Sequence, residues 1–300
     1  MTSESQLAEI FEQHRPRLRA LAYRVLGSWS DAEDAVQEAW LRLARQDADA
    51  IDRLPGWLTT VTGRICIDAL RSRASRPEIP IDQDLPELVV TDDAETPEDT
   101  AVLSESVGLA LLVVLGSLRP DERLAFVLHD MFAVPFAEIG QLLGRSADAA
   151  KMLASRARRK VQDVPQPTGD RRAQREVVDA FLAAAQGGDF DALLRVLDPD
   201  VTWRQHTSRG VTVMAGSSAI VEAVRRGQGA RITARRVLVN GEPGILAWGP
   251  TGRPLSLMAC TVRAGRLVGI VSIADPARLA GMDLPQDPQA PASAHQPPRR

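Results

Sequence analysis

The sequence predicts a multidomain chain in which two all-α domains precede one α+β domain. Three observations support this prediction. Apolar residues recur with helical period from Leu7 to about residue 76, and again from Ala101 to about residue 163. An acidic stretch broken by prolines separates these two parts. Beyond residue 170 the pattern changes to helices mixed with alternating, strand-like segments.

The first domain, residues 1–76, is expected to contain three helices. The first ends at Gly27, a residue type that commonly follows a helix. The second begins with Ser30 as N-cap, and Glu33 reaches back to it in the pattern of a capping box. The third begins near Trp57, after a Pro-Gly pair, and ends among arginines. A helical bundle is therefore expected here.

Residues 77–100 are expected to form an acidic linker. They hold many Asp and Glu residues and several prolines, and they contain no Lys or Arg. Such a composition disfavours a packed core and favours an extended chain. The second domain, residues 101–163, is expected to be helical up to Leu118 and to resume after Pro120.

The second domain ends in a predicted helix-turn-helix from Pro135 to Gln162. Gly140 has no side chain at a point where a second helix could cross closely, and Gly144 suits the left-handed position that ends the first helix. Ser146 is placed to cap the second helix. Two helices joined by such a tight glycine turn form the motif that enters the DNA major groove.

A short linker, residues 164–170, leads to the third domain, residues 171–283. Its order is helix, helix, strand, helix and then strands, with a hairpin at Ala264-Gly265. Residues 284–300 are rich in Pro, Gln and Ala, a composition typical of a disordered tail.

Composition limits the class of protein. The 300 residues carry a net charge of −3 and are 44% hydrophobic, as in globular proteins. No apolar run approaches the ~20 residues of a membrane helix, and no secretory signal is recognisable, so a cytoplasmic location without membrane attachment is expected. Cys66 and Cys260 lie far apart, which favours buried reduced thiols. We expect no metal and no cofactor.

The second helix of the helix-turn-helix carries an outward face rich in cations. Residues near its start would reach base edges, and later arginines would contact phosphates. The alternative is a solvated face on a structural helix pair. The candidate DNA-binding residues are Ser146, Asp148, Ala149, Lys151, Met152, Ser155, Arg156, Arg158 and Arg159.

Three ordered motifs resemble those of bacterial RNA polymerase sigma factors of the extracytoplasmic-function type. The first is D-A-E-D-x-V-Q-E, at Asp31 to Glu38. The second is W-L followed by I-D-x-L-R, at Trp57-Leu58 and Ile67 to Arg71. The third is E-I-A-x-x-L-G followed by R-A-R, matched by Glu138, Ile139, Leu143 and Gly144 and by Arg156, Ala157 and Arg158. The resemblance extends from Met1 to about Asp163, with regions 2 and 4 as the two helical domains.

The resemblance implies partners for each face. Core RNA polymerase would be bound through its β′ clamp helices and β flap, and promoter DNA through the −35 and −10 elements. The acidic linker would thread the polymerase channel, and the loop from Gln46 to Arg53 would hold an unpaired base. By resemblance, Asp34, Gln37, Glu38 and Arg42 would bind the polymerase, and Arg64, Asp68, Arg71, Arg73 and Arg76 would bind the −10 element. Gly63 and Arg64 depart from the family's common Arg-Asn.

The third domain resembles the SnoaL-like branch of the NTF2-like cone fold, which a known sigma subgroup carries as a built-in regulator. The subgroup's linker motif is reduced here, its glycine-rich motif is absent near Thr207, and its terminal motif is altered. The cis-regulatory candidates are therefore Leu85, Pro86, Glu87, Asp275, Pro276, Arg278 and Leu279.

Cone folds can also bind small ligands or catalyse reactions, with Trp203, His206 and Trp248 as possible pocket residues. We expect no catalysis, and a protein–protein role ahead of a small apolar ligand. Two other classes remain open: a helix-turn-helix regulator that needs no polymerase, and a cone-fold enzyme with a DNA-binding appendage.

Overall fold

The computed structural model describes residues 4–46, 51–74, 86–92, 108–162, 164, 168 and 170–287. The chain divides into two compact units. The helical unit comprises Met1–Glu87 and Leu111–Val164, and the C-terminal unit comprises Leu88–Ala110 and Pro165–Arg300. Arg76 and Leu85, two of the candidate site residues, lie outside the described residues, as does most of the expected tail.

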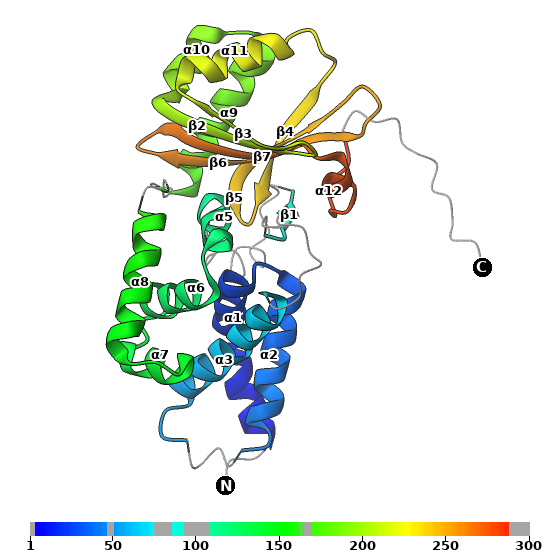
Figure 1. The fold of residues 1–300 in the computed structure, drawn as a ribbon. Helices are drawn as coiled ribbons and strands as arrows, with labels where there is room; N and C mark the ends of the chain where they lie inside the picture. Colours follow the sequence, from blue (N-terminus) through cyan, green and yellow to red (C-terminus); the bar gives the residue numbers. More distant parts are fainter. Residues whose placement is uncertain are drawn as a thin grey trace, which may run out of the picture. The chain divides into compact units, whose positions relative to one another are not determined.

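Three long helices form the first half of the helical unit: α1 (Glu4–Leu26), α2 (Trp29–Leu43) and α3 (Leu54–Ala74) (Figure 1). Each packs against the other two. α3 begins three residues earlier than the sequence predicts, since Pro55 lies in its first turn, where proline is tolerated. The apolar faces meet in a core of Leu7, Phe11, Leu18, Val36, Leu43 and Leu58.

The predicted cap of α2 is wrong by two residues. Gly27 ends α1 at φ 73°, and the next residue, Ser28, is the N-cap and accepts a hydrogen bond from Asp31 N–H at 3.2 Å. The Glu33 carboxylate instead forms ion pairs with the guanidinium groups of Arg19, at 2.8 Å, and Arg15, at 3.3 Å. Burial opposes ionisation of Glu33, but these two guanidinium groups outweigh it and lower its pKa.

The second half of the helical unit contains α6 (Pro120–Phe126), a π-helical turn η3 (Val127–Met131), α7 (Phe136–Leu143) and α8 (Ala147–Val161). α6 and α7 both pack on α8. Before them runs α5 (Leu109–Ser117), which crosses the division between the two units. The continuous helix expected after Pro120 becomes π-helical at Val127, which widens its last turn.

A seven-stranded sheet forms the centre of the C-terminal unit, in the order β1-β4-β5-β6-β7-β2-β3. All pairs are antiparallel except β2 with β7. The predicted Ala264-Gly265 hairpin joins β6 to β7, and both residues have positive φ, 50° and 74°. The strands are β1 (Val90–Thr91), β2 (Leu197–Thr207), β3 (Gly210–Ala215), β4 (Thr233–Val239), β5 (Glu242–Trp248), β6 (Pro254–Arg263) and β7 (Arg266–Ile273).

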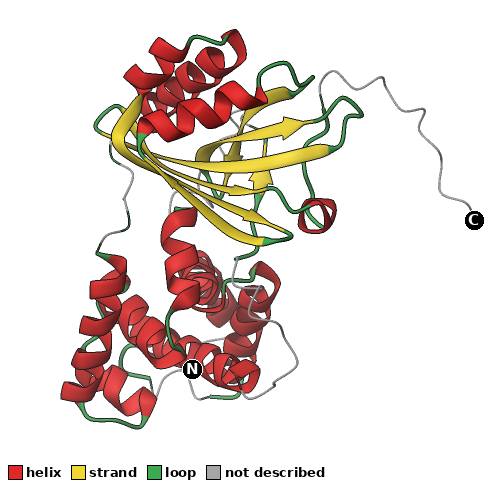
Figure 2. Cartoon of the chain, turned by 45° about the horizontal axis from the view of Figure 1, so that its top comes forward, coloured by secondary structure: helices red, strands yellow, loops and turns green. Residues whose placement is uncertain are grey.

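Three helices cover one face of this sheet: α9 (Arg171–Gly187), α10 (Phe190–Val196) and α11 (Ser217–Gly227) (Figure 2). Their buried faces meet the sheet in one core, which includes Val178, Phe181, Leu193, Ile220 and Ile270. A short helix, α12 (Pro276–Ala280), contacts β6. The predicted α+β order is confirmed, and β1 is an addition to it, contributed by the segment expected to be a linker.

Candidate nucleic-acid interface

The turn between α7 and α8 has the predicted helix-turn-helix geometry. Gly144 ends α7 in the left-handed conformation at φ 67°, and Arg145 N–H returns to the carbonyl of Gly140 at 2.8 Å. A Cβ atom on Gly140 would lie only 2.8 Å from the carbonyl oxygen of Arg145. Ser146 caps α8 by accepting from Ala149 N–H at 3.1 Å. The turn is therefore fixed by backbone contacts that other residue types would disturb.

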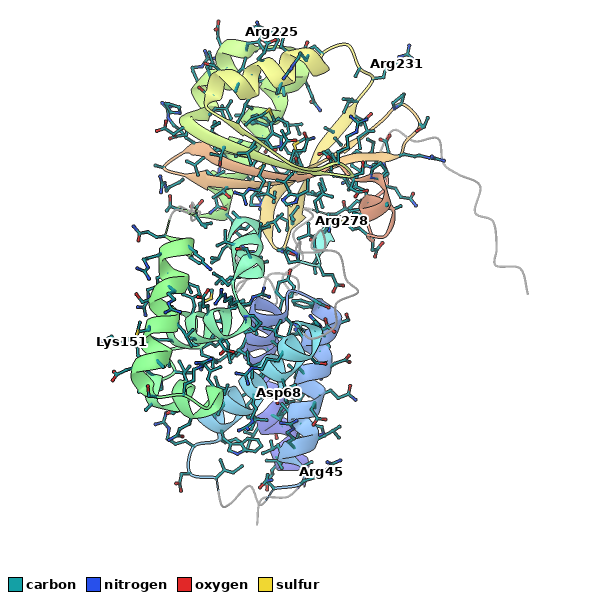
Figure 3. The ribbon with its side chains drawn as sticks, in the orientation of Figure 1. Arg45, Asp68, Lys151, Arg225, Arg231 and Arg278 are labelled. Atoms are coloured by element: carbon teal, nitrogen blue, oxygen red, sulfur yellow. The ribbon has the colours of Figure 1, made fainter. Side chains whose placement is uncertain are left out.

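The outward face of α8 combines cations with one large apolar side chain. Ala150, Ala154, Ala157 and Val161 are buried, so the opposite face is left to solvent. Lys151 projects from that face (Figure 3), as do Ser155, Arg156, Arg159 and Met152, whose exposed fraction is 59%.

Two other cations of α8 are paired within the helical unit. Arg158 contacts Asp130 at 2.6 Å, and Lys160 contacts the buried carboxylate of Glu122 at 3.0 Å. Within the described part of the chain, Lys151, Arg156 and Arg159 make no ion pair. These three cations are therefore free to meet phosphates.

Two of the α3 side chains proposed to contact the −10 element, Arg71 and Arg73, are paired with carboxylates of the same unit. Arg71 donates to Asp121 at 3.0 Å, and Arg73 pairs with Asp31 and donates to the carbonyl of Leu26 at 3.4 Å. Asp68 is exposed on α3 (Figure 3). Arg71 and Arg73 would therefore have to leave these partners before they could contact DNA, which the sequence does not indicate.

A cavity of about 380 Å³ opens beside Arg64, between α3 and α7. Arg53, Trp57 and Arg64 line one side, and Glu138 and Gln141 line the other. The sequence could not predict that Glu138 lies in the same cavity as Arg53 and Arg64, because this depends on how α7 packs on α3. Trp57 also lines this cavity and supplies an aromatic ring beside Arg53 and Arg64, of the kind on which unpaired bases stack.

The candidate polymerase face of α2 lies opposite its buried stripe. Ala32, Ala35, Val36, Ala39 and Leu43 are buried, while Asp34 and Gln37 are exposed. Glu38 and Arg42 form an ion pair one helical turn apart, at 2.9 Å. Asp34 and Gln37 are therefore available to a partner, whereas Glu38 and Arg42 are already paired with each other.

The cis-regulatory candidates Pro86 and Glu87 are fixed to the helical unit. The Glu87 carboxylate accepts from the N–H of Trp29 at 2.7 Å and from Ser28 Oγ at 3.2 Å. Gly27 lies beside Pro86, since a Cβ there would be 3.8 Å from Pro86 Cβ. Just beyond them, Val90 and Thr91 pair with Val239 and Leu238 in the C-terminal unit. The chain passes from one unit to the other at this segment.

The altered terminal motif starts α12. Asp275 caps this helix by accepting from Ala277 N–H at 2.9 Å, and Pro276 occupies its first turn. Leu279 is buried, with 3% of its surface exposed, so the motif has a packing role in its own domain. Arg278 is half-buried on the same turn (Figure 3).

The three candidate pocket residues do not share one face of the sheet. Trp203 packs against the core under α9–α11, and its indole N–H donates to Ser272 Oγ at 2.7 Å. His206 lies three residues further along β2, so its side chain points to the opposite face. Trp248 lies three residues beyond Ile245, which belongs to the same core, so the Trp248 side chain points to the opposite face. The guanidinium carbon of Arg235 lies 5.6 Å from the centre of the Trp248 ring.

Two side chains of the C-terminal unit, the half-buried Glu242 and the buried Cys260, have raised pKa values. Burial raises the pKa of Glu242 to about 7, although the charge of Arg171 opposes this shift. Burial also raises the pKa of Cys260 to about 12, as it does for Cys66. Both cysteines are buried free thiols, as predicted, and neither is activated as a nucleophile.

Among the described residues, no three His, Cys, Asp or Glu side chains gather in a way that could hold a metal ion. No helix in the described ranges is long and apolar enough to cross a membrane.

The helix-turn-helix, the three-helix bundle and the α+β domain together define a transcription protein with two helical DNA-recognition modules and an appended cone domain. Family models agree: "Sigma-70 region 2" matches residues 10–76, "Sigma-70, region 4" matches 108–161, and "SnoaL-like domain" matches 178–271.

Whole-chain relatives extend this agreement. The chain is 42% identical to the ECF RNA polymerase sigma factor SigJ of Mycobacterium tuberculosis, over 91% of this chain and 93% of that protein. It is 35% identical to the probable ECF sigma factor SigI of the same species, over 93% and 97%. The crystal structure of SigJ matches with a TM-score of 0.68 at 37% identity, over 93% of this chain and all of that one. The chain belongs to the family of ECF RNA polymerase sigma factors.

Proposed function

We propose that the protein binds core RNA polymerase and directs it to −35 and −10 promoter elements to initiate transcription, and that its SnoaL-like domain regulates this activity in cis. The observation that carries the proposal is the outward face of α8. Lys151, Arg156 and Arg159 are free of ion pairs within the described chain, on a helix held by a glycine turn in the geometry of major-groove readers.

The −35 element would be read by the first turns of α8. Asp148, Ala149 and Met152 lie near the helix start, where side chains reach base edges. The exposed Met152 side chain suits apolar contact with a thymine methyl group. Arg156 and Arg159 lie further along the helix and would neutralise phosphates, which positions the helix without reading sequence.

The −10 element would be bound by α3, and the polymerase by α2. Arg64, Asp68 and Arg71 share one side of α3, and Arg64 stands beside the aromatic face of Trp57. An unpaired base could stack on Trp57 while Arg53 and Arg64 approach its phosphates. Asp34 and Gln37 on α2 would meet the β′ clamp helices.

Regulation in cis would act through the segment between the two promoter-binding halves. The segment Leu88–Ala110, fully extended, reaches about 80 Å. Because Val90 and Thr91 pair with β4, the segment cannot extend over its full length. While this pairing lasts, these two residues would not be available to enter a polymerase channel. Release of β1 would therefore favour the polymerase-bound form.

The SnoaL-like domain would act as a binding module, without catalysis. Its helix-facing side is occupied by a packed core in which the Trp203 indole is already hydrogen-bonded. Any small ligand would have to displace these contacts, so a protein–protein role is favoured.

Run-off transcription with purified core polymerase tests the proposal. The full chain should yield a transcript from a cognate promoter, and core polymerase alone should not. The variant Lys151→Ala/Arg156→Ala should lose that transcript while retaining affinity for the core. Absence of any promoter-dependent transcript, or of any affinity for core polymerase, would refute the proposal and favour a stand-alone regulator.

A further inference from the structure

The cavity between α3 and α7 is lined by opposite charges that do not pair. The two helices lie side by side (Figure 1), and the cavity of about 380 Å³ falls within the ~300–1,000 Å³ of small-ligand sites. Arg53, Arg64 and Glu138 all line it, yet within the described residues none of their side chains forms an ion pair or a hydrogen bond. Such a cavity suits a ligand with an anion at one end and hydrogen-bond donors at the other.

One stripe along α3 supplies the basic wall of the cavity. Arg53, Trp57, Thr60 and Arg64 follow one another at spacings of four, three and four residues, which places them on one helical face. Arg53 directly precedes the helix, and its guanidinium lies by the first turn, since a Cβ at Gly56 would be 4.0 Å from Arg53 Nη2. Helix N-termini favour anions, and guanidinium groups match the geometry of phosphate. The two arginines therefore form an anion subsite.

Trp57 and Leu142 form the apolar part of the cavity. Trp57 is half-buried and packs in part against the core of the helical unit, which holds its ring in place. Leu142 of α7 is 8% exposed. Every nucleobase has a π face that can stack on an aromatic side chain. A flat, aromatic ligand group therefore suits the space between the two arginines and α7.

Glu138 and Gln141 of α7 supply the polar wall opposite the arginines. A carboxylate accepts hydrogen bonds and can take two side by side, whereas an amide can also donate. Among the common bases, guanine alone presents two neighbouring donors, N1–H and N2–H, with the acceptor O6 beside them. Adenine, cytosine and uracil would each turn an acceptor toward the Glu138 charge. This pair of side chains therefore selects guanine.

We propose that the cavity binds a free guanine nucleotide. The base stacks on Trp57 and donates to the Glu138 carboxylate, and the phosphate pairs with Arg53 and Arg64. The same ring and the same arginines are the groups proposed above to meet an unpaired promoter base, so the nucleotide competes with the −10 strand. That competition rests on the function proposed above, whereas nucleotide binding by the free chain does not.

Isothermal titration calorimetry on the full chain tests the site, with guanosine monophosphate (GMP), guanosine and adenosine monophosphate (AMP) as probes. The wild type should bind GMP about tenfold more tightly than AMP, since AMP leaves Glu138 facing an acceptor. Guanosine should bind more weakly than GMP, because it lacks the phosphate. GMP should also quench tryptophan fluorescence, and Trp57→Phe should remove most of that quenching.

Two variants assign the two ends of the ligand. Arg64→Ala should weaken GMP binding about tenfold and leave guanosine binding unchanged, because only GMP carries the anion. Glu138→Gln should bring the affinities for GMP and AMP close together, because the new amide no longer offers two acceptors to guanine. Arg119→Ala removes an exposed arginine of the same unit that does not line the cavity, and should change neither affinity. Unchanged guanosine binding shows that Arg64→Ala is folded.

Two further titrations separate a free nucleotide from a guanine of the promoter. In the first, the chain is titrated with a short single-stranded DNA that contains one guanine, and with the same strand carrying adenine instead. In the second, GMP is added to holoenzyme bound to a promoter fragment with an unpaired −10 strand. GMP should weaken promoter binding by the wild type, and weaken it much less in Glu138→Gln.

Guanine-dependent binding of the DNA strand without any binding of GMP would overturn the proposal and assign the cavity to the promoter. Equal affinity of the wild type for GMP and AMP would refute the selection of guanine by Glu138. GMP binding that leaves promoter affinity unchanged would refute the competition. None of these results depends on run-off transcription, which tests the sigma-factor function by itself.

Discussion

The carboxylate of Glu87 caps the helix that begins at Trp29, with its Oε2 2.7 Å from the Trp29 nitrogen. The backbone of Glu87 is held as well: its N–H donates to the carbonyl of Gly27 at 2.8 Å, and its carbonyl accepts from the Tyr23 hydroxyl at 2.6 Å. A residue of the acidic segment is therefore part of the helical unit. It fixes the start of α2, the helix proposed to face core polymerase.

Glu87→Ala should destabilise the helical unit by about 1 kcal/mol, the usual value of a lost helix cap. Glu87→Gln retains an acceptor oxygen and should cost clearly less, since only the interaction of its charge with the helix dipole is lost. Urea denaturation followed by far-UV circular dichroism measures both. Equal losses for the two variants would show that charge, not the hydrogen bond, matters at this cap.

Gly140→Ala should destabilise the helical unit although alanine favours helices. Helix propensity would gain about 1 kcal/mol, but the new methyl group would lie 2.8 Å from the Arg145 carbonyl oxygen and 2.9 Å from the Ser146 carbonyl carbon. Both are backbone atoms that cannot turn away, and overpacking of this kind costs about 1–3 kcal/mol. We expect a net loss of about 1–2 kcal/mol by thermal and urea denaturation.

Gly187→Ala is the matched control. Gly187 ends α9, and a Cβ there would meet nothing within 4 Å. This variant should be neutral or more stable by up to about 1 kcal/mol. If Gly140→Ala changed the free energy of unfolding no more unfavourably than Gly187→Ala does, the close approach of the α7–α8 turn would not require glycine at position 140.

Local chemistry predicted the parts of the fold that depend on neighbours in sequence. Gly144 and Ser146 end one helix and begin the next by backbone geometry alone, and the Ala264-Gly265 turn follows from its flanking strands. Sequence motifs also indicated the family. Each of these features involves contacts within a few residues, which a sequence pattern records directly.

Tertiary partners were not predictable in the same way. Ser30 is as good a capping residue as Ser28, and only the exact end of α1 decides between them. Asp121 follows Pro120 in the first turn of α6, and nothing nearby in sequence indicates that Arg71 and Arg145 both donate to its carboxylate. Val90 and Thr91 form a strand only because β4, which lies far later in the chain, offers them an edge.

The pH dependence of stability should reveal Glu242. Its folded pKa is about 7, above the 4.5 of an exposed glutamate, so the folded state holds more protons than the unfolded state between these values. Stability from this group is therefore present below about pH 4.5 and is lost as the pH rises through 7. A shift of this size corresponds to about 3 kcal/mol at most.

Glu242→Gln should remove this loss. The variant should be more stable than the wild type at pH 8, and the difference should shrink or reverse at pH 5, as measured by urea denaturation followed by tryptophan fluorescence. Asp200→Asn, at an exposed carboxylate of the same domain for which no such gain is expected, serves as the control. A gain for Glu242→Gln that does not change with pH would contradict a raised pKa for the Glu242 carboxyl group.

Arg156 should act on promoter affinity through phosphate contact. It is exposed on α8 and makes no ion pair within the described chain, so its removal disturbs no internal partner. Arg156→Ala should weaken holoenzyme binding to different promoters by similar factors and reduce the slope of log affinity against log salt by about 1. Filter binding or fluorescence anisotropy over a salt series measures both quantities.

Two comparisons separate phosphate contact from other causes. Arg231→Ala removes one exposed arginine from the loop after α11 (Figure 3) and should leave the salt slope unchanged. Met152→Ala should change affinity unequally among promoters and leave the slope intact, because its thioether carries no charge and would contact base edges. If Arg156→Ala gave the wild-type slope, or weakened only promoters of one sequence, a phosphate role for Arg156 would be excluded, and a base-reading role would take its place.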